Sequence, residues 1–108
     1  MTLIAYTVRC RFEDDAIASA WLDWLRADHL AEVVAAGAID AEAIRLDGAP
    51  CVCEIRYHFA SREAFCAYER DHAPRLRAEG LKRFPPERGL RYERSVGEVA
   101  ALRSQGWR

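Results

Sequence analysis

The sequence has no long apolar run and no excess of charge of either sign. No stretch approaches the roughly 20 apolar residues that a membrane-spanning helix needs, so we expect no membrane partner. The formal net charge is −1 at pH 7, and a chain without a net positive field does not attract nucleic acid by charge alone. The remaining composition is that of an ordinary globular protein.

Several motifs of enzymes and metal proteins are also missing. The sequence has no serine-based triad motif, no glycine-rich loop that cradles phosphate and no dinucleotide-binding fingerprint. Its four cysteines lack the paired C-x₂-C spacing of zinc sites, and Cys51 and Cys53 are poorly spaced for a disulfide within one strand. We therefore expect no metal and no cofactor, with the cysteines, including Cys10 and Cys66, packed as small core hydrophobes.

The N-terminal segment, "LIAYTVRCRF", has the pattern of a strand and not of a signal peptide. Apolar and polar side chains alternate along it, and arginines follow the first apolar residues at once. Without an export signal we expect a cytoplasmic protein, in which the reducing surroundings keep the cysteines as free thiols.

The hydrophobic pattern predicts the order of the secondary structure. Alternating segments predict strands at residues 3–12, 38–46, 51–60 and 90–99. Apolar residues three and four apart predict helices at residues 13–37 and 62–72, with a short further turn after Pro74.

The resulting β-α-β-β-α-β order is that of the α+β, ferredoxin-like fold. In this fold two helices cover one face of an antiparallel four-stranded sheet. A length of 108 residues predicts one such domain over residues 1–97, followed by a C-terminal tail over residues 98–108.

Two similar phrases, "DHLAEVVAAG" and "DHAPRLRAEG", occur 43 residues apart. The same shift maps Leu25 onto Tyr68 and Val33 onto Leu76, so the repeat reflects the two β-α-β halves of the fold. His29 and His72 lie on the apolar stripes of their helices. We expect structural histidines, each bonded to a carbonyl or carboxylate near a helix bend; a metal pair or a general base is the alternative.

The strand alternation predicts one apolar and one polar face of the sheet. The apolar face, which includes Tyr6, Phe12, Tyr57 and Phe59, should pack against the helices because this buries the most apolar area. The opposite face is then polar, with the residues Thr7, Arg9, Arg11, Glu54, Arg56, His58, Arg91, Glu93 and Ser95.

Three roles are open to the polar face: solvation, nucleic-acid binding or contact with a second subunit. Nucleic-acid binding is disfavoured because the aromatic side chains on which bases stack lie on the helix side. Pairing with a second copy is attractive because opposite charges can pair across a twofold axis. A solvated face is the simpler alternative.

The polar face also holds the candidate ligand-binding residues His58, Arg9, Arg11, Arg56 and Glu54. The arginines can hold a carboxylate or phosphate, and a histidine can move protons near neutral pH. The alternative is a network of salt bridges at the subunit interface.

Two tryptophans, Trp21 and Trp24, lie three residues apart on the first predicted helix. We expect both to pack between helix and sheet. One of them can instead line a pocket at the mouth of the barrel.

Two segments, "WLDWLRADHLAEVVAAGAI" and "YERDHAPRLRAEGLKRFP", carry a family resemblance. The chain resembles small bacterial proteins of unassigned function in the dimeric α+β-barrel (ferredoxin-like) superfamily, which also holds antibiotic-biosynthesis-type monooxygenases, muconolactone-isomerase-like enzymes and haem-handling proteins. The resemblance covers most of residues 3–97 and implies a homodimer whose sheets face each other. It implies no catalytic residues. Leu30 and Ala31 stand where family members often have proline, so the first helix is expected to continue unbroken.

The sequence therefore predicts a cytoplasmic homodimer, formed through the open sheet face, that binds a small molecule or another protein. A cofactor-independent monooxygenase or isomerase acting on a small organic substrate is the alternative, and it rests on analogy of fold. Haem binding through His29 or His72 is a third hypothesis.

Overall fold

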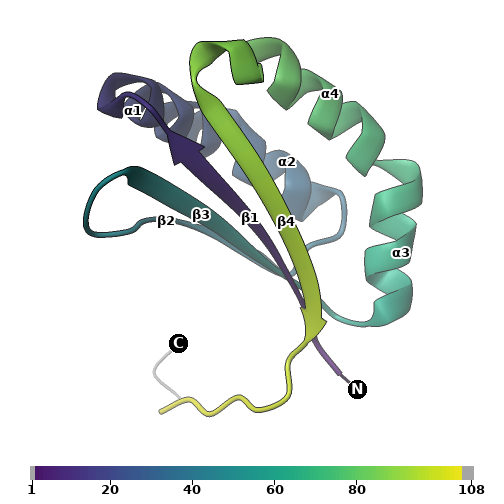
Figure 1. Ribbon diagram of the computed structural model, residues 1–108. Helices are drawn as coiled ribbons and strands as arrows, with labels where there is room; N and C mark the ends of the chain where they lie inside the picture. The colour runs from purple at the N-terminus through teal and green to yellow at the C-terminus, as the bar shows by residue number, and fades with distance from the viewer. Residues whose placement is uncertain (1, 106–108) are drawn as a thin grey trace.

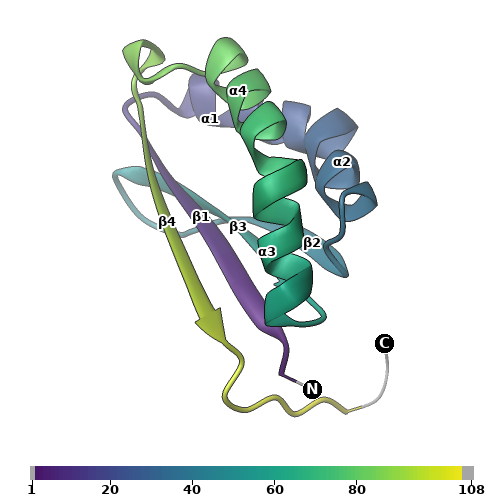
Figure 2. The ribbon, with the colours of Figure 1, turned by 90° about the vertical axis from the view of Figure 1, so that its right-hand side faces the viewer.

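The computed structural model describes residues 2–105. It contains one four-stranded sheet with the helices on one side (Figure 1, Figure 2). The strands are β1 (Ile4–Phe12), β2 (Asp40–Arg45), β3 (Cys51–Phe59) and β4 (Leu90–Glu98). The helical segments are α1 (Asp15–Trp24), η1 (Leu25–His29), α2 (Leu30–Ala35), α3 (Arg62–Asp71), α4 (Ala73–Arg83) and η2 (Pro86–Arg88).

The strands lie in the order β2-β3-β1-β4, and all neighbours are antiparallel. This confirms the predicted ferredoxin-like arrangement. The central strands β1 and β3 pair from Ile4 opposite Phe59 to Phe12 opposite Cys51. Their alternation separates a face covered by helices from a face that no element of the described chain covers.

The core lies between the sheet and the helices, as the alternation predicts. Tyr6, Phe12, Tyr57 and Phe59 are all buried on the helix side. Burying such large aromatic side chains contributes much of the favourable free energy of folding.

The first helical layer runs without interruption from α1 through η1 to α2, as predicted. The side chain of Asp14 accepts a hydrogen bond from the backbone N–H of Ala16 at 2.7 Å and caps α1. The segment η1 is a π-helical turn, a local widening of the helix that is frequent at functional sites. Gly37 follows the layer with φ +132°, a conformation that favours glycine.

The second helical layer is divided into α3 and α4. Ser61 caps α3 by accepting a hydrogen bond from the N–H of Ala64 at 3.0 Å. The chain leaves helical geometry at His72, where φ is −129°, and Pro74 lies in the first turn of α4, where its missing N–H costs nothing. The sequence predicted only a short turn here. The structure corrects this to a helix of 11 residues, because buried Leu76 anchors it to the core.

The two similar phrases occupy corresponding places but are not equivalent throughout. His29 closes the π-helical turn, and His72 marks the break between α3 and α4. Gly37 follows a helix, whereas Gly80 lies inside α4, where an added Cβ atom would stand 3.3 Å from Cη2 of Trp24. The repeat thus places irregular helix geometry in both halves. The glycines differ, because Gly37 allows a positive φ after a helix and Gly80 leaves room for the indole of Trp24.

Strand β4 extends to Glu98, one residue into the predicted tail. The N–H of Val99 then donates to the carbonyl oxygen of Leu3 at 2.9 Å, and residues 100–105 belong to no helix or strand. Within residues 2–105, no helix combines the length and the apolar character needed to cross a membrane.

Candidate functional site

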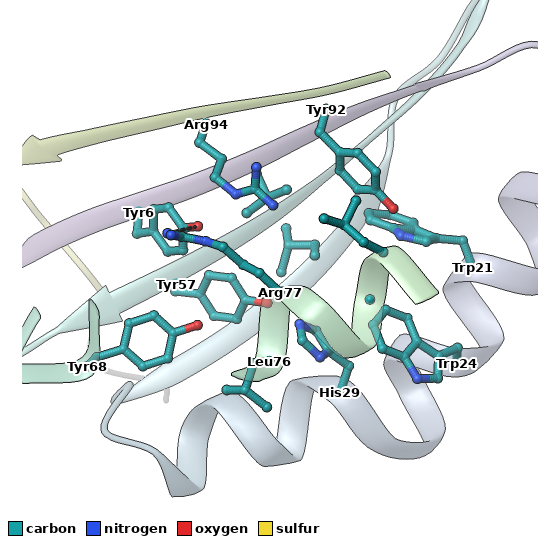
Figure 3. A pocket seen from close by; sticks show the side chains of 14 residues that line it. Tyr6, Trp21, Trp24, His29, Tyr57, Tyr68, Leu76, Arg77, Tyr92 and Arg94 are labelled. Carbon is teal, nitrogen blue, oxygen red and sulfur yellow. Dashed lines mark hydrogen bonds between the residues drawn. The ribbon is translucent and has the colours of Figure 1, made fainter. Parts of the chain in front are cut away.

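A cavity lies on the helix side of the sheet, between α4, the first helical layer and strands β1, β3 and β4 (Figure 3). It is enclosed largely by aromatic side chains, with three polar or charged side chains among them. Its lining includes Tyr6, Trp21, Trp24, His29, Tyr57, Tyr68, Leu76, Arg77, Gly80, Leu81, Tyr92 and Arg94.

The cavity has a buried floor and an accessible mouth. Trp21, Tyr57 and Leu76 are at most 2% exposed, whereas Leu81 is 44% exposed and Arg94 is also exposed. The water-accessible volume is ≈ 40 Å³, room for about three water molecules at roughly 10–15 Å³ each. A larger ligand must therefore extend through the mouth or displace side chains there.

His29 forms one wall of the cavity. Its ring stacks on the indole of Trp24, with centroids 4.5 Å apart and planes inclined by 23°. Its Nδ1 atom is buried without a hydrogen-bond partner in the described chain. Burial lowers the pKa of His29 to about 4, although the carboxylate of Glu79 opposes the shift. The imidazole is therefore neutral at physiological pH, and its Nδ1 atom has an unused hydrogen-bonding capacity.

Arg77 reaches the cavity from α4 (Figure 3). Its Nη2 atom donates to the hydroxyl of Tyr6 at 3.2 Å and to Oε2 of Glu69 at 2.5 Å. Its Nε–H is buried without an acceptor. Within residues 2–105, Nδ1 of His29 and Nε of Arg77 are the buried side-chain atoms without a hydrogen-bond partner, and both residues line this cavity.

Three tyrosines extend the wall towards α3. The rings of Tyr6 and Tyr57 stack with centroids 5.6 Å apart, and the ring of Tyr68 lies 6.5 Å from that of Tyr6. Burial raises the pKa of Tyr57 strongly and that of Tyr68 to about 12. The hydroxyl groups of both therefore stay protonated and can donate hydrogen bonds.

Arg94 gives the mouth a positive charge. Its guanidinium lies 5.6 Å from the centre of the Tyr92 ring. No ion pair of Arg94 exists within the part of the chain that the structure describes. The described lining thus holds two arginines and no aspartate or glutamate.

The site residues predicted from the sequence lie on the other side of the sheet. Glu54 is buried and accepts hydrogen bonds from two half-exposed arginines: from Nε and Nη2 of Arg9 at 2.9 and 2.6 Å, and from Nε and Nη2 of Arg56 at 3.1 and 2.9 Å. The bonds from Arg56 and Arg9 lower the pKa of Glu54. These three residues form a charge network whose members satisfy one another.

The remaining two predicted residues do not join this network. Nδ1 of His58 lies 2.9 Å from Oδ1 of Asp40 on the edge strand β2. Arg11 stands directly opposite Arg91 in the β1–β4 register. Together with Arg9 and Glu93 these two arginines line a pocket of ≈ 370 Å³ on the open face. Ligand binding by the five predicted residues stays a prediction.

The two histidines predicted to be structural differ in their surroundings. Nδ1 of His29 has no partner, and Nδ1 of His72 lies 3.3 Å from the guanidinium of Arg75. The predicted bond of each histidine to a carbonyl or carboxylate therefore does not involve Nδ1, and the structural role of both stays a prediction.

The four cysteines are free thiols, as predicted. Cys10 and Cys53 are buried, and burial raises the pKa of their thiols to about 12 and about 11. Cys66 is exposed, so the core prediction is wrong for it, because α3 turns Phe65 and Tyr68 towards the sheet instead. No set of three His, Cys, Asp or Glu side chains suited to a metal ion occurs within residues 2–105.

The cavity was not predicted from the sequence, although two residue patterns indicate it. Arg94 follows the alternation of Leu90 and Tyr92 and so belongs to the helix side of β4, where a charged residue is unusual. Trp21 and Trp24 both line the cavity. From the sequence, a place in a pocket was an alternative for one of them.

Comparisons with solved structures show other proteins of the same fold. A dimeric ferredoxin-like protein from an uncultured marine organism has a TM-score of 0.74 at 13% identity, covering 97% of this chain and 100% of that one. SnoaB, a cofactor-independent oxygenase from Streptomyces nogalater, has a TM-score of 0.67 at 12% identity, covering 98% and 99%. At these identities the likeness shows the fold alone.

Other structures with this fold include antibiotic-biosynthesis monooxygenase-like proteins, such as one from Nitrosomonas europaea with a TM-score of 0.61 at 14% identity, covering 93% and 90%. The expected ferredoxin-like fold is thereby confirmed. Among curated proteins no significant match is found. The family described as "Domain of unknown function (DUF4286)" matches residues 3–93, and the chain belongs to this family.

Proposed function

We propose that this protein is a homodimer that binds a small organic molecule in the cavity between its sheet and α4. The observation that carries the proposal is that two residues lining one cavity, His29 and Arg77, each hold a buried polar atom without a partner, Nδ1 and Nε. A buried polar atom without a partner costs roughly 1–3 kcal/mol. Proteins retain such atoms mainly where a ligand or an ordered water completes the bonding.

The wall of the cavity supports a small-molecule ligand over a protein partner. Its aromatic rings supply apolar area, and its few polar groups point into the same space, as is typical of ligand pockets. A protein partner would need a broad surface instead, since stable interfaces bury about 1,200 Å² or more.

The open sheet face is the proposed dimer interface. Glu54 is only 6% exposed even in the single chain, and its network with Arg9 and Arg56 is suited to a desolvated surface. Arg11 and Arg91 oppose each other with like charges, which is unfavourable in one chain and would be relieved by carboxylates of a second copy. The dimeric ferredoxin-like proteins of the same fold support this assembly. We place the dimer in the cytoplasm, where buried thiols stay reduced.

A cofactor-independent oxygenase or isomerase is the second candidate. His29 favours it, because an imidazole that lines the cavity can accept a proton from a substrate, although a pKa of about 4 makes it a weaker base than an exposed histidine. Removing a proton from a C–H group is the first step of many isomerisations. The likeness to SnoaB in fold supports the same reading.

Native mass spectrometry of the protein, purified without denaturation, tests assembly and ligand retention together. We expect a mass of two chains, with additional mass that is lost on denaturation. The variant Leu76→Trp, which fills the cavity floor, should keep the dimer and lose the additional mass. A single-chain mass at micromolar concentration contradicts the dimer. Retention of the same additional mass by Leu76→Trp contradicts the cavity as the site.

Exchange of an activated C–H group tests the second candidate. We expect the protein in D₂O to accelerate deuterium uptake at the α-carbon of 1-tetralone, followed by NMR, and His29→Gln to abolish the acceleration. His72→Gln is the matched control, because that residue does not line the cavity. Equal rates for wild type and His29→Gln would exclude His29 as the base.

A further inference from the structure

We propose that the ligand of this cavity is an organic acid, whose carboxylate lies between Arg77 and Arg94 and whose flat apolar body lies at the mouth. This inference rests on the proposed function and adds the chemical class of the ligand. Three observations carry it: the charge of the lining, the free donor of Arg77 and the size of the space.

The charge of the lining favours an anion. Arg77 and Arg94 both line the cavity, and no carboxylate does. The charge of Arg77 is partly compensated, because Glu69 accepts a bond from its Nη2 atom. Arg94 has no carboxylate partner within residues 2–105. One positive charge is therefore uncompensated, which matches a ligand with a single negative charge.

The two guanidinium groups approach the cavity from opposite elements. Arg94 extends from β4, Arg77 extends from α4, and both lie beside Tyr6 (Figure 3). Tyr6 already accepts a bond from Arg77 at 3.2 Å, which holds the guanidinium in place. Nε–H of Arg77 has no acceptor, and a carboxylate oxygen is the strongest acceptor that a small organic molecule can offer it.

The volume indicates which part of the ligand enters. A space of ≈ 40 Å³ accommodates about three non-hydrogen atoms, if each takes the volume of a water molecule. A carboxylate group has this size. The rest of the molecule then lies against Leu81, which is 44% exposed, and the ring of Tyr92, and flat apolar groups suit such a surface.

His29, at the opposite wall, limits the negative charge that the ligand can carry. Its imidazole is neutral and so adds no second charge. A dianion would therefore meet only one uncompensated positive charge, whereas a monoanion matches it.

The test compares three probes of one shape: benzoate, benzamide and benzyl alcohol. Binding at neutral pH is followed through the indole N–H signals of Trp21 and Trp24 in NMR spectra, because both residues line the cavity. The third tryptophan, Trp107, lies outside the described residues and is replaced by phenylalanine in every sample. We expect saturable shifts with benzoate and at least about tenfold weaker binding of the two neutral probes, since a charge-assisted bond contributes about that much.

The variants separate the charge of Arg94 from a general effect on the sheet. Arg94→Gln should weaken benzoate binding about tenfold, and Arg94→Lys should restore part of it. Arg91→Gln is the matched control, because that arginine is exposed on the same strand but on the open face; it should bind benzoate as wild type does.

The outcomes also distinguish the two proposals. If the neutral probes bind as tightly as benzoate, or if Arg94→Gln binds benzoate unchanged, the organic-acid inference is wrong and the binding cavity stands. If none of the three probes shifts the indole signals at millimolar concentration, the cavity itself fails as a binding site, and the inference fails with it.

Discussion

The imidazole of His29 stacks on the indole of Trp24, with ring centroids 4.5 Å apart. The two residues are five positions apart, and they meet because the π-helical turn Leu25–His29 widens the helix between them. The stack shields the ring from water, and Nδ1 is buried without a partner. A local irregularity of one helix therefore places a partly buried histidine in the wall of the candidate site.

Acid should destabilise the protein through His29. The pKa of His29 is about 4 in the folded state and about 6.5 when exposed. The unfolded chain thus binds a proton between these values and the folded protein does not, so the free energy of unfolding falls as pH falls from 6.5 to 4. The full effect is about 3 kcal/mol.

Denaturant titrations at pH 7 and pH 4 check this prediction. His29→Gln should lose less stability between the two pH values than wild type, whereas His72→Gln should lose as much as wild type. Parallel pH profiles for wild type and His29→Gln would show that the folded protein tolerates a charged imidazole at this position.

Gly80→Ala should change the cavity more than it changes stability. An added Cβ atom would stand 3.3 Å from Cη2 of Trp24, so the indole must move by a few tenths of an ångström. Alanine in a helix is favoured over glycine by up to about 1 kcal/mol, which offsets the contact. We expect the indole N–H signal of Trp24 to shift and the melting temperature to stay within a few degrees. An unchanged Trp24 signal contradicts the predicted contact.

Glu54→Gln should weaken the open sheet face. The amide cannot accept charge-assisted bonds from both Arg9 and Arg56, and two arginines would then lack their carboxylate. We expect the free energy of unfolding to fall by about 1–2 kcal/mol. Glu93→Gln is the control on the same face, because that exposed residue has no ion pair within residues 2–105. Equal losses in both variants would mean that the Glu54 network adds nothing.

Thr7→Arg should dissociate the proposed dimer. Thr7 lies at the middle of the open face, between Arg56 and Ser95 in the register. An arginine at this position would add a third positive charge beside Arg56 and Arg9, and these charges would repel the same charges of the facing copy. Light scattering at micromolar concentration should report two chains for wild type and one for Thr7→Arg. Arg26→Glu, on the exposed side of η1, should stay dimeric. If both variants keep the wild-type mass, the open face is not the interface.

The fold could be predicted because its determinants are local. Alternation in β1 and β3 assigns Tyr6 and Tyr57 to the buried face whatever the rest of the chain does, and the 43-residue shift between the two phrases reflects the duplication of one β-α-β unit. The division of the second helical layer could be predicted only in part. Pro74 marks the break in the sequence, but the length of α4 depends on the burial of Leu76 against the sheet.

The candidate site could not be predicted in the same way, because it depends on distances between elements. Strand periodicity follows from backbone geometry, so the residue pattern alone assigns each strand residue to the helix side or to the open face. It therefore places Arg9, Glu54 and Arg56 on one face. Packing in three dimensions is what makes these charges satisfy one another and what brings Arg77 and His29, from two helical layers and each with an unpartnered atom, to one cavity. A hydrogen bond forms only when donor and acceptor lie within about 3 Å of each other, and the packing of the helices on the sheet sets these donor–acceptor distances.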